Sequence, residues 1–233
     1  MAPKIVSLLE IRQELEMMED GIMFSLIQRS RRKANKGMYT PEKNSQFSRS
    51  FFDCFLFEQE SFHSRFGRYL DRTEHPFFEG LPHCIVKRRA RDCALAEGIE
   101  INVNGRIKRT YLDQLAFFCA EGDEEGDYGS SAEYDVRCLQ ELSRRIHYGM
   151  VVAESKYHDD PAGYGELVKV GDRPGVVAKL RDIKVEEKIL ARLKDKGIRY
   201  GFNPGLISNF YKDHVIPMTI DVEVDYLFRR AKN

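Results

Sequence analysis

The stretch that decides the fold lies past the middle of the chain and reads Cys138-Leu-Gln-Glu-Leu-Ser-Arg-Arg-Ile-His-Tyr-Gly-Met-Val-Val-Ala-Glu-Ser-Lys156. Side chains in it recur at spacings of three and four residues, and they are Cys138, Leu142, Arg145, Gly149, Val152 and Lys156. This spacing follows one face of an α-helix and predicts an uninterrupted helix from about Tyr134 to Tyr157. Arg145 and Lys156 are eleven residues apart, close to three full turns, so both cations are expected on that face.

Helical periodicity also covers the first half of the chain. A first long helix is predicted from Lys4 to about Arg32, and the cluster of cations that closes it complements the negative end of its dipole. A second helix is predicted over about Phe47–Tyr69, and a third runs from near Gly105 to Phe118. Between them, residues 71–105 have little periodicity and are interpreted as a long excursion with short helical pieces.

The C-terminal part carries three further helical segments. Asp172 is a candidate N-cap for a helix that ends near Leu180, and Val185–Lys196 is predicted as the next helix, with Gly197 as its stop signal. The last helix is predicted over about 205–230 with a kink at Pro217, because proline removes one backbone N–H. The predicted fold class is therefore all-α, a single-domain bundle of long helices over residues 1–233.

Composition narrows the class of protein. The 233 residues contain 37 Lys+Arg and 37 Asp+Glu, so the net charge is zero and a dedicated nucleic-acid binder is not expected. No apolar run approaches the roughly 20 residues of a membrane span, and the N-terminus carries no secretory or transit pattern. Five scattered cysteines without a CxxC pair are typical of reduced thiols. Together these features predict a cytoplasmic protein with no membrane partner.

Motifs for metal or covalent chemistry are few. The acidic run from Glu121 to Glu133 fails the calcium-loop pattern, because Tyr134 or Ala132 stands where the bidentate Glu belongs, and we interpret it as a tight connection between helices. His83-Cys84 with Cys93 is the only Cys/His grouping, and its spacing does not favour zinc. No GxSxG, HExxH, phosphate-loop or GxGxxG motif occurs, so no metal or cofactor is predicted.

The informative residues are ionisable groups that fall inside apolar stripes. Arg12 and Glu19 lie in such a stripe of the first helix, and Thr219 and Glu223 form an i, i+4 pair in the last. An inward cation is costly unless something negative meets it. One interpretation is internal pairing, of Arg12 with Glu19 and of Arg145 with Glu186 or Glu223. The other is a pocket between helices for a small polyanion that carries two carboxylates and a hydroxyl.

The segment Cys138–Lys156 resembles the signature helix of the all-helical chorismate mutases of fungi and plants. Further segments agree with that family in order along the chain, and they are Ile11–Phe24, Glu74–Phe78, Tyr128–Ala132, Val185–Leu190 and Val215–Arg230. The resemblance runs from residue 5 to residue 230. It implies an enzyme of phenylalanine and tyrosine biosynthesis that converts chorismate to prephenate by a Claisen rearrangement. This reaction takes place within one molecule, so it needs no nucleophile, metal or cofactor.

The resemblance also implies roles for individual residues. Arg12 and Arg145 match the cations that clamp the two substrate carboxylates, for which the guanidinium fork is suited. Lys156 matches the lysine that donates to the ether oxygen, where negative charge collects in the transition state. Glu223 matches a glutamate that contacts the same oxygen and must be protonated to donate to it.

Three further positions complete the implied substrate site. Glu186 matches the residue that binds the substrate hydroxyl, and Thr219 matches one near the ring carboxylate. Asp182 departs from the family, because the fungal type has Asn there, and an extra carboxylate either weakens substrate binding or accepts from the ring hydroxyl. The family is homodimeric, so a homodimer is expected.

The effector site implied by the resemblance is degenerate. Regulated fungal members use an Arg-Arg pair at the end of the second helix and a Thr early in the central-helix region. Here Gly67 stands at the first arginine and Glu133 at the threonine, where its charge would repel an effector carboxylate. The residues expected to outline this site are Gly67, Arg68, Asp127, Gly129, Ser130 and Glu133. Little or no response to tyrosine or tryptophan is therefore predicted, and binding of an amino-acid effector is doubtful.

Two alternatives differ from a biosynthetic enzyme. The first is a catalytically silent helical dimer that acts as an interaction module, although such a protein has no reason to retain the inward cations. The second is a mutase delivered outside the cell to drain chorismate, against which the absence of a secretory pattern counts.

Overall fold

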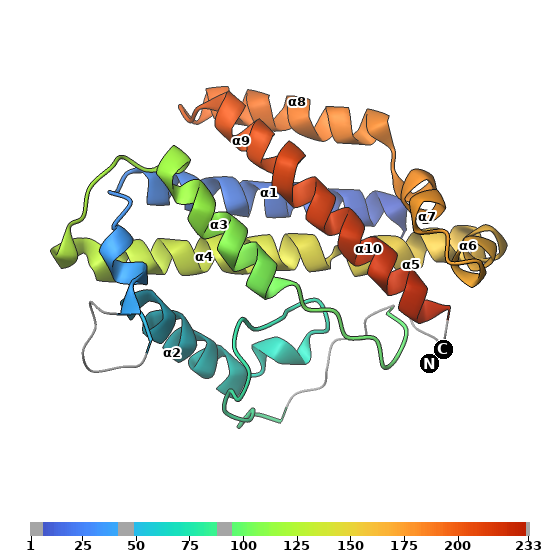
Figure 1. Ribbon diagram of the computed structural model, residues 1–233, viewed down its shortest axis with the longest axis horizontal. Helices are drawn as coiled ribbons and strands as arrows, with labels where there is room; N and C mark the ends of the chain where they lie inside the picture. Colours follow the sequence, from blue (N-terminus) through green and yellow to red (C-terminus); the bar gives the residue numbers. More distant parts are fainter. Residues whose placement is uncertain (1–6, 42–48, 88–94, 232–233) are drawn as a thin grey trace. The chain divides into compact units, whose positions relative to one another are not determined.

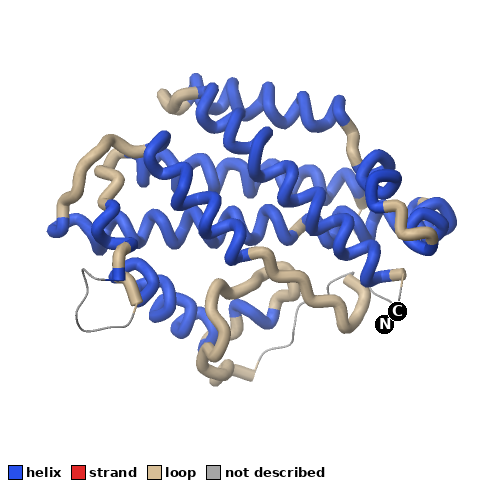
Figure 2. The backbone as a smooth tube through the Cα atoms, viewed as in Figure 1, coloured by secondary structure: helices blue, strands red, loops and turns tan. Residues whose placement is uncertain are grey.

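The structure is a computed structural model that describes residues 7–41, 49–87 and 95–231. All regular secondary structure in these ranges is helical, apart from one isolated bridge between Lys33 and Ala120, so the prediction of an all-α chain is confirmed (Figure 2). The chain divides into two compact units. Unit 1 comprises Met1–Glu19, Asp92–Val103 and Arg144–Asn233, and unit 2 comprises Asp20–Arg91 and Asn104–Ser143. The prediction of one domain over residues 1–233 stays a prediction.

Unit 2 contains the second part of α1 (Leu8–Ser30), α2 (Phe51–Arg65), α3 (Asn104–Phe118) and the first part of α4 (Tyr128–His147). Short 3₁₀ turns lie at Lys36–Tyr39, Arg68–Leu70 and Glu125–Asp127. Its core consists of fully buried apolar side chains, among them Ile22, Leu26, Phe52, Leu56 and Leu139. The side chains come from α1, α2 and α4, as the period of their apolar residues requires.

The second helix is shorter than predicted at both described ends. Ser50 caps its N-terminus by accepting a hydrogen bond from the backbone N–H of Asp53 (3.1 Å), so the helix begins at Phe51. At the other end Gly67 has φ of 79°, a left-handed conformation that ends helices and favours glycine. The predicted start at Phe47 lies outside the described residues.

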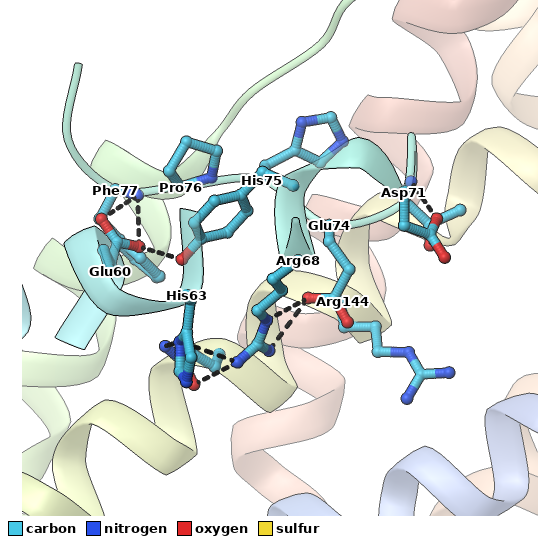
Figure 3. Close-up of polar contacts among 12 residues, drawn as sticks. Glu60, His63, Arg68, Asp71, Glu74, His75, Pro76, Phe77 and Arg144 are labelled. Atoms are coloured by element: carbon cyan, nitrogen blue, oxygen red, sulfur yellow. Dashed lines mark hydrogen bonds and ion pairs between the residues drawn. The ribbon is translucent and has the colours of Figure 1, made fainter. Parts of the chain in front are cut away.

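The connection after α2 is organised by Glu60, whose side chain is fully buried. Its carboxylate accepts hydrogen bonds from the backbone N–H groups of Phe77 (2.8 Å) and Phe78 (3.1 Å) and from the hydroxyl of Tyr69 (3.1 Å), as Figure 3 shows in part. Residues 71–87 and 95–103 contain no helix, so the predicted short helical pieces are wrong for these ranges. Cys93, from the Cys/His grouping considered above, lies outside the described residues.

Unit 1 holds the remaining helices, which are α5 (Gly149–Asp159), α6 (Pro161–Lys169), α7 (Arg173–Leu180), α8 (Ile183–Arg199), α9 (Pro204–Phe210) and α10 (Ile216–Arg230). α10, drawn in red in Figure 1, packs against α5, α6 and α7, and α8 packs against α9. The buried apolar side chains include Met150, Leu193, Ile207, Val222 and Leu227. α6 was not predicted, because Gly163 and Gly165 dilute the apolar pattern of this nine-residue helix.

The helix predicted over about 134–157 is in fact two helices, α4 and α5, that meet at Tyr148. The carbonyl of Tyr148 accepts from both Val151 (3.0 Å) and Val152 (3.2 Å), so one turn is tightened locally. The next residue, Gly149, faces α10 closely, since a Cβ there would lie 3.0 Å from the carbonyl oxygen of Thr219. α4 also begins earlier than predicted, at Tyr128.

Gly197 does not stop α8, contrary to the prediction, because the helix continues to Arg199. Gly197 is instead a contact glycine, since a Cβ at this position would lie 2.9 Å from the Cα of Pro204. The helix ends in a Schellman motif at Gly201, which has φ of 66°. In this motif the N–H of Phe202 donates to Gly197 (2.9 Å) and that of Gly201 to Ile198 (3.2 Å).

The helix predicted over about 205–230 consists of three consecutive helical segments, and the kink at Pro217 stays a prediction. α9 passes into a π-helical turn at Tyr211–Val215 before α10 begins at Ile216. Pro217 then occupies the first turn of α10, where its missing N–H costs no internal helical hydrogen bond. The predicted helix at Asp172–Leu180 is confirmed as α7, with Asp172 accepting from the N–H of Gly175 (2.9 Å).

Candidate active site

A cavity of about 730 Å³ opens in unit 1, lined by residues of α1, α4, α5, α6, α7, α8 and α10. The seven substrate-site residues that the sequence predicts all line it, namely Arg12, Arg145, Lys156, Asp182, Glu186, Thr219 and Glu223. Its volume is that of a small-molecule site. Cations and carboxylates therefore converge on one cavity from positions far apart in the sequence.

Arg145 reaches this cavity from the end of α4 and is almost completely buried, with 3% of its surface exposed. Its Nη1 lies 3.4 Å from the hydroxyl oxygen of Thr219, which donates its own proton to the carbonyl of Val215 (2.8 Å). The Nε atom of Arg145 has no hydrogen-bond partner among the described residues. A buried guanidinium with an unused donor is energetically unfavourable, so the arrangement suits an anion bound in the cavity.

Lys156 and Glu223 form the second charged group, brought together where α5 crosses α10. The Lys156 ammonium donates to the carbonyl of Leu180 (2.7 Å) and lies 3.4 Å from Oε2 of Glu223. Burial raises the pKa of Glu223, while Lys156 and Arg145 act to lower it. Because the burial effect is larger, Glu223 keeps a proton to higher pH than an ordinary glutamate.

The approach of α5 to α10 depends on the glycine between them. A Cβ at Gly149 would lie 3.1 Å from Cγ2 of Thr219 and 3.3 Å from Cγ of Glu223. Both distances are shorter than ordinary van der Waals contact. The missing side chain therefore allows the two cavity residues of α10 to lie directly beside the helix that carries Lys156.

The connection from α7 to α8 supplies the opposite charges. Asp182 is the N-cap of α8, where its Oδ1 accepts from the N–H of Val185 (3.2 Å). Glu186 lies in the first turn of α8 and binds both nitrogens of one edge of Arg181, at 2.9 Å from Nε and 2.6 Å from Nη2. The sequence prediction missed Arg181, although it precedes the predicted position 182 directly.

The internal pairing considered from the sequence is wrong for Arg12 with Glu19 and for Arg145 with Glu186, whereas Arg145 does act electrostatically on Glu223. Glu19 is completely buried and binds Arg192 of α8 (2.7 Å), not Arg12. Glu186 binds Arg181 rather than Arg145. Arg12 lines the cavity, and no hydrogen bond or ion pair joins it to another residue in the described part of the chain. Two of the predicted cations thus keep free donors toward the cavity.

Tyr164 is a further cavity residue that the sequence prediction did not include. It belongs to α6 and is 4% exposed, with its hydroxyl 3.5 Å from the carbonyl oxygen of Lys179. Burial, assisted by the charge of Glu223, raises the pKa of Tyr164 to about 12. Its helix gave no apolar period that would have drawn attention to it.

The predicted effector residues lie in unit 2, where a smaller cavity of about 560 Å³ is lined by residues of α2, of α4 and of the 3₁₀ turn at Arg68–Leu70. Arg68 and Glu133 line this cavity, whereas Gly67, Asp127, Gly129 and Ser130 are not among its described lining residues. Asp127 instead forms an ion pair with Arg32.

The two charged residues of this smaller cavity already have partners. Arg68 donates to Glu74 (3.0 Å) and to the side-chain oxygen of Gln140 (2.7 Å), as Figure 3 shows for Arg68 and Glu74. Glu133 accepts from Gln59 (2.6 Å) and from Arg137 (2.8 Å). An incoming ligand with a carboxylate would therefore have to displace Glu74 from Arg68.

No helix in the described part of the chain is long and apolar enough to cross a membrane.

Comparisons with known proteins agree on one family. Residues 128–224 match the family model described as chorismate mutase type II. The chain is 37% identical over 255 residues to a chorismate mutase of Emericella nidulans, covering 99% of this chain and 95% of that protein.

Solved structures are similar over the same extent. The chorismate mutase Aro7p of Candida albicans, in complex with L-Trp, superposes with a TM-score of 0.93 at 36% identity, covering 98% of this chain and 93% of that one. The structure of AtCM1 with tyrosine bound in its allosteric site superposes with a TM-score of 0.86 at 32% identity, covering 97% of each chain.

Proposed function

Because this chain belongs to the chorismate mutase family and is an enzyme that isomerises chorismate to prephenate, we propose that the cavity of unit 1 is where the rearrangement takes place. The family resemblance inferred from the sequence is confirmed. The observation that carries the proposal is the buried guanidinium of Arg145, whose Nε has no partner among the described residues. A substrate carboxylate satisfies it.

The two substrate carboxylates bind Arg145 and Arg12 in this proposal. Arg145 offers its free Nε edge, and Thr219 adds a hydroxyl beside it. Arg12 stands without an ion-pair partner in the described residues and lines the same cavity. A guanidinium binds a carboxylate through two parallel N–H donors, which fixes the orientation of the substrate as well as its position.

Lys156 and Glu223 act on the ether oxygen. In the rearrangement the C–O ether bond breaks as a C–C bond forms within the same molecule, so no co-reactant is consumed. Bond breaking runs ahead, and negative charge grows on the ether oxygen. The ammonium of Lys156 and the carboxyl of Glu223 both donate to this oxygen. Glu223 can donate because burial raises its pKa and so keeps the carboxyl protonated.

Glu186 and Asp182 complete the site from the start of α8. Glu186 accepts the hydrogen bond of the substrate hydroxyl. One carboxylate oxygen of Asp182 caps α8, and in our proposal the other oxygen faces the substrate in the cavity. Asn also caps helices well, so the Asp182→Asn variant retains the cap and tests the extra charge alone.

The product fits the biosynthesis of phenylalanine and tyrosine, for which prephenate is the precursor. We propose this pathway for the chain on the strength of its family. We also propose a cytoplasmic homodimer, and the exposed aromatic side chains of Phe62 (60% exposed) and Phe66 (47% exposed) in unit 2 are suited to its interface. Light scattering of the purified protein measures the oligomer, and fractionation of cells measures the location.

Regulation by aromatic amino acids is weak in our proposal. Relatives do bind such ligands, since Aro7p is solved with L-Trp and AtCM1 with tyrosine or phenylalanine in an allosteric site. In this chain, however, Arg68 is held by Glu74, and Glu133 adds a negative charge to the cavity that carries it. An effector carboxylate must overcome both before it biases the enzyme.

The direct test of the proposed function follows chorismate absorbance after purified protein is added. Rapid loss of absorbance with accumulation of prephenate supports the enzyme, whereas a rate equal to that of the buffer would favour the catalytically silent dimer. Glu223→Gln and Lys156→Ala, measured in the same assay, connect the activity to the cavity of unit 1.

A further inference from the structure

Arg181 has no role in the function proposed so far, yet it makes the best-formed ion pair of the cavity. Two of its nitrogens, Nε and Nη2, donate to the two oxygens of Glu186 at 2.9 and 2.6 Å. This two-point geometry fixes the plane and the direction of a carboxylate, which a single contact does not. Both residues line the cavity of unit 1.

The pair contributes little to stability. The Arg181 side chain is 42% exposed and that of Glu186 18%, and ion pairs at such partly exposed sites add little to the stability of a fold. A separate role therefore has to explain why an arginine stands here. The short connection 180–182 already has two tasks, since Leu180 offers its carbonyl to Lys156 and Asp182 caps α8.

The charge balance of the cavity points to that role. Chorismate brings two carboxylates, and an uncompensated Glu186 would repel both of them at close range. Arg181 compensates this charge. It also occupies only one lone pair on each Glu186 oxygen, so each oxygen retains a second lone pair that can accept from a hydroxyl.

We propose that Arg181 is a positioning residue for substrate binding, which compensates the charge of Glu186 and aims its carboxylate at the substrate hydroxyl. The inference rests on the proposed role of Glu186. Arg181 acts through Glu186 and makes no contact with the reacting atoms. Its effect is therefore expected in KM and not in kcat, since the hydroxyl contact is present equally in the ground state and the transition state.

The test compares Arg181→Ala, Arg181→Lys and Glu186→Gln with the double variant Arg181→Ala/Glu186→Gln. The control is Arg173→Ala, because Arg173 lies at the other end of α7 and also pairs with a carboxylate, that of Asp225, but does not line the cavity of unit 1. Steady-state kinetics with chorismate gives kcat and KM for each protein, and thermal unfolding verifies that each is folded.

We expect Arg181→Ala to raise KM about threefold to tenfold with kcat within about twofold of the wild type. Arg181→Lys, which keeps the charge but not the two-point geometry, should recover part of the loss. In the Glu186→Gln background, Arg181→Ala should change KM by less than about twofold, because no charge remains to compensate. Arg173→Ala should behave as the wild type.

Other results would overturn the inference. An unchanged KM in Arg181→Ala, while Glu186→Gln raises KM, removes the positioning role and leaves the role of Glu186 intact. A loss in Arg181→Ala that persists undiminished in the Glu186→Gln background means that Arg181 contacts the substrate directly. A wild-type KM in Glu186→Gln overturns both the inference and the proposed role of Glu186.

Discussion

Arg29 in unit 2 and Arg145 in unit 1 are both buried arginines, and they differ in how fully their donors are used. Arg29 donates from Nε to Asp135 (2.7 Å) and from its two remaining nitrogens to the carbonyls of Lys33 (2.7 Å) and Ala34 (2.9 Å). Arg145 makes one long contact, to Thr219 (3.4 Å), and its Nε has no partner among the described residues. Burial and residue type are the same, so neither identifies function by itself.

The use of its donors identifies Arg29 as a structural arginine. The partners of Arg29 come from the chain, including the carboxylate of Asp135 and the carbonyls that follow the end of α1. Tyr39 and Tyr111 also donate to Asp135, at 2.5 and 2.7 Å, so both members of the pair are satisfied. The free donor of Arg145 is available to a ligand, because the chain itself does not satisfy this buried charge.

The largest expected effect comes from Arg29→Met. It leaves Asp135 buried without its cation, and removing one partner of a buried pair costs about 3–5 kcal/mol of unfolding free energy. Burial already raises the pKa of Asp135, so proton uptake would relieve part of this cost at low pH. Urea unfolding followed by circular dichroism measures the loss. A loss below about 1 kcal/mol would break the distinction between the two arginines.

The next effect is that of Lys156→Ala on catalysis. If its ammonium stabilises charge on the ether oxygen, the variant loses roughly 3–4 kcal/mol of transition-state stabilisation, by analogy with the loss of an oxyanion donor. The fold should persist, because burial raises the pKa of Glu223 and the carboxyl takes up a proton when its cation is removed. Lys194→Ala, at an exposed site of α8, is the matched control. Turnover above about a tenth of the wild-type value would contradict the assignment.

The Arg145→Met variant tests the difference between Arg145 and Arg29 directly. We expect kcat/KM to fall by about a hundredfold or more, because a substrate carboxylate loses its guanidinium. The unfolding free energy should change by less than about 1 kcal/mol or increase, since the substitution removes a charge that the chain does not satisfy. Parallel unfolding and kinetic measurements with Arg29→Met give the contrast. Similar destabilisation of the two variants would contradict it.

A smaller effect concerns pH. Burial raises the pKa of Glu223, so its protonated, donating form persists to higher pH and is lost as pH rises through that raised value. Activity should therefore decline toward alkaline pH. Glu223→Gln should remain active with a flatter profile above neutrality, because an amide donates at every pH. An unchanged alkaline decline in Glu223→Gln would assign the titration to another group.

The smallest effect is the response to effectors. Tyrosine or tryptophan at sub-millimolar concentration should change activity by less than about twofold at subsaturating chorismate, because a larger shift needs strong preference for one state. The matched variant is Glu74→Gln, which frees Arg68 from its anionic partner and should strengthen any response. A change of several-fold in the wild type would refute weak regulation.

The sequence predicted the cavity residues better than it predicted their partners. The positions 12, 145, 156, 219 and 223 were predicted because helical period and family resemblance agree on them, position 186 was predicted from the resemblance, and all line one cavity. The pairing of Arg12 with Glu19 failed because Glu19 binds Arg192, a residue 173 positions later. Arg181 was missed because it lies in a connection, where no period marks it.

Helix boundaries were likewise predicted correctly where the signal is local and incorrectly where it depends on a distant contact. Local signals succeeded where the cap lies in the helix itself, as at Asp172. They failed at Gly197, which contacts Pro204, and they missed the break at Tyr148, which precedes the glycine that contacts α10. A glycine that ends a helix and a glycine that allows another helix or loop to pack closely cannot be distinguished from the sequence alone. Only the packing distinguishes them.

The carbonyl of Leu180 has a consequence for the temperature dependence of the reaction. This carbonyl accepts a hydrogen bond from the Lys156 ammonium (2.7 Å) before any ligand enters, and Glu223 contacts a second N–H of the same ammonium. The two contacts orient the ammonium, so its third N–H points in a fixed direction. The rotational freedom of this long side chain is then lost during folding and not during catalysis. Catalysis by Lys156 should therefore lower the activation enthalpy of the rearrangement and change its activation entropy little.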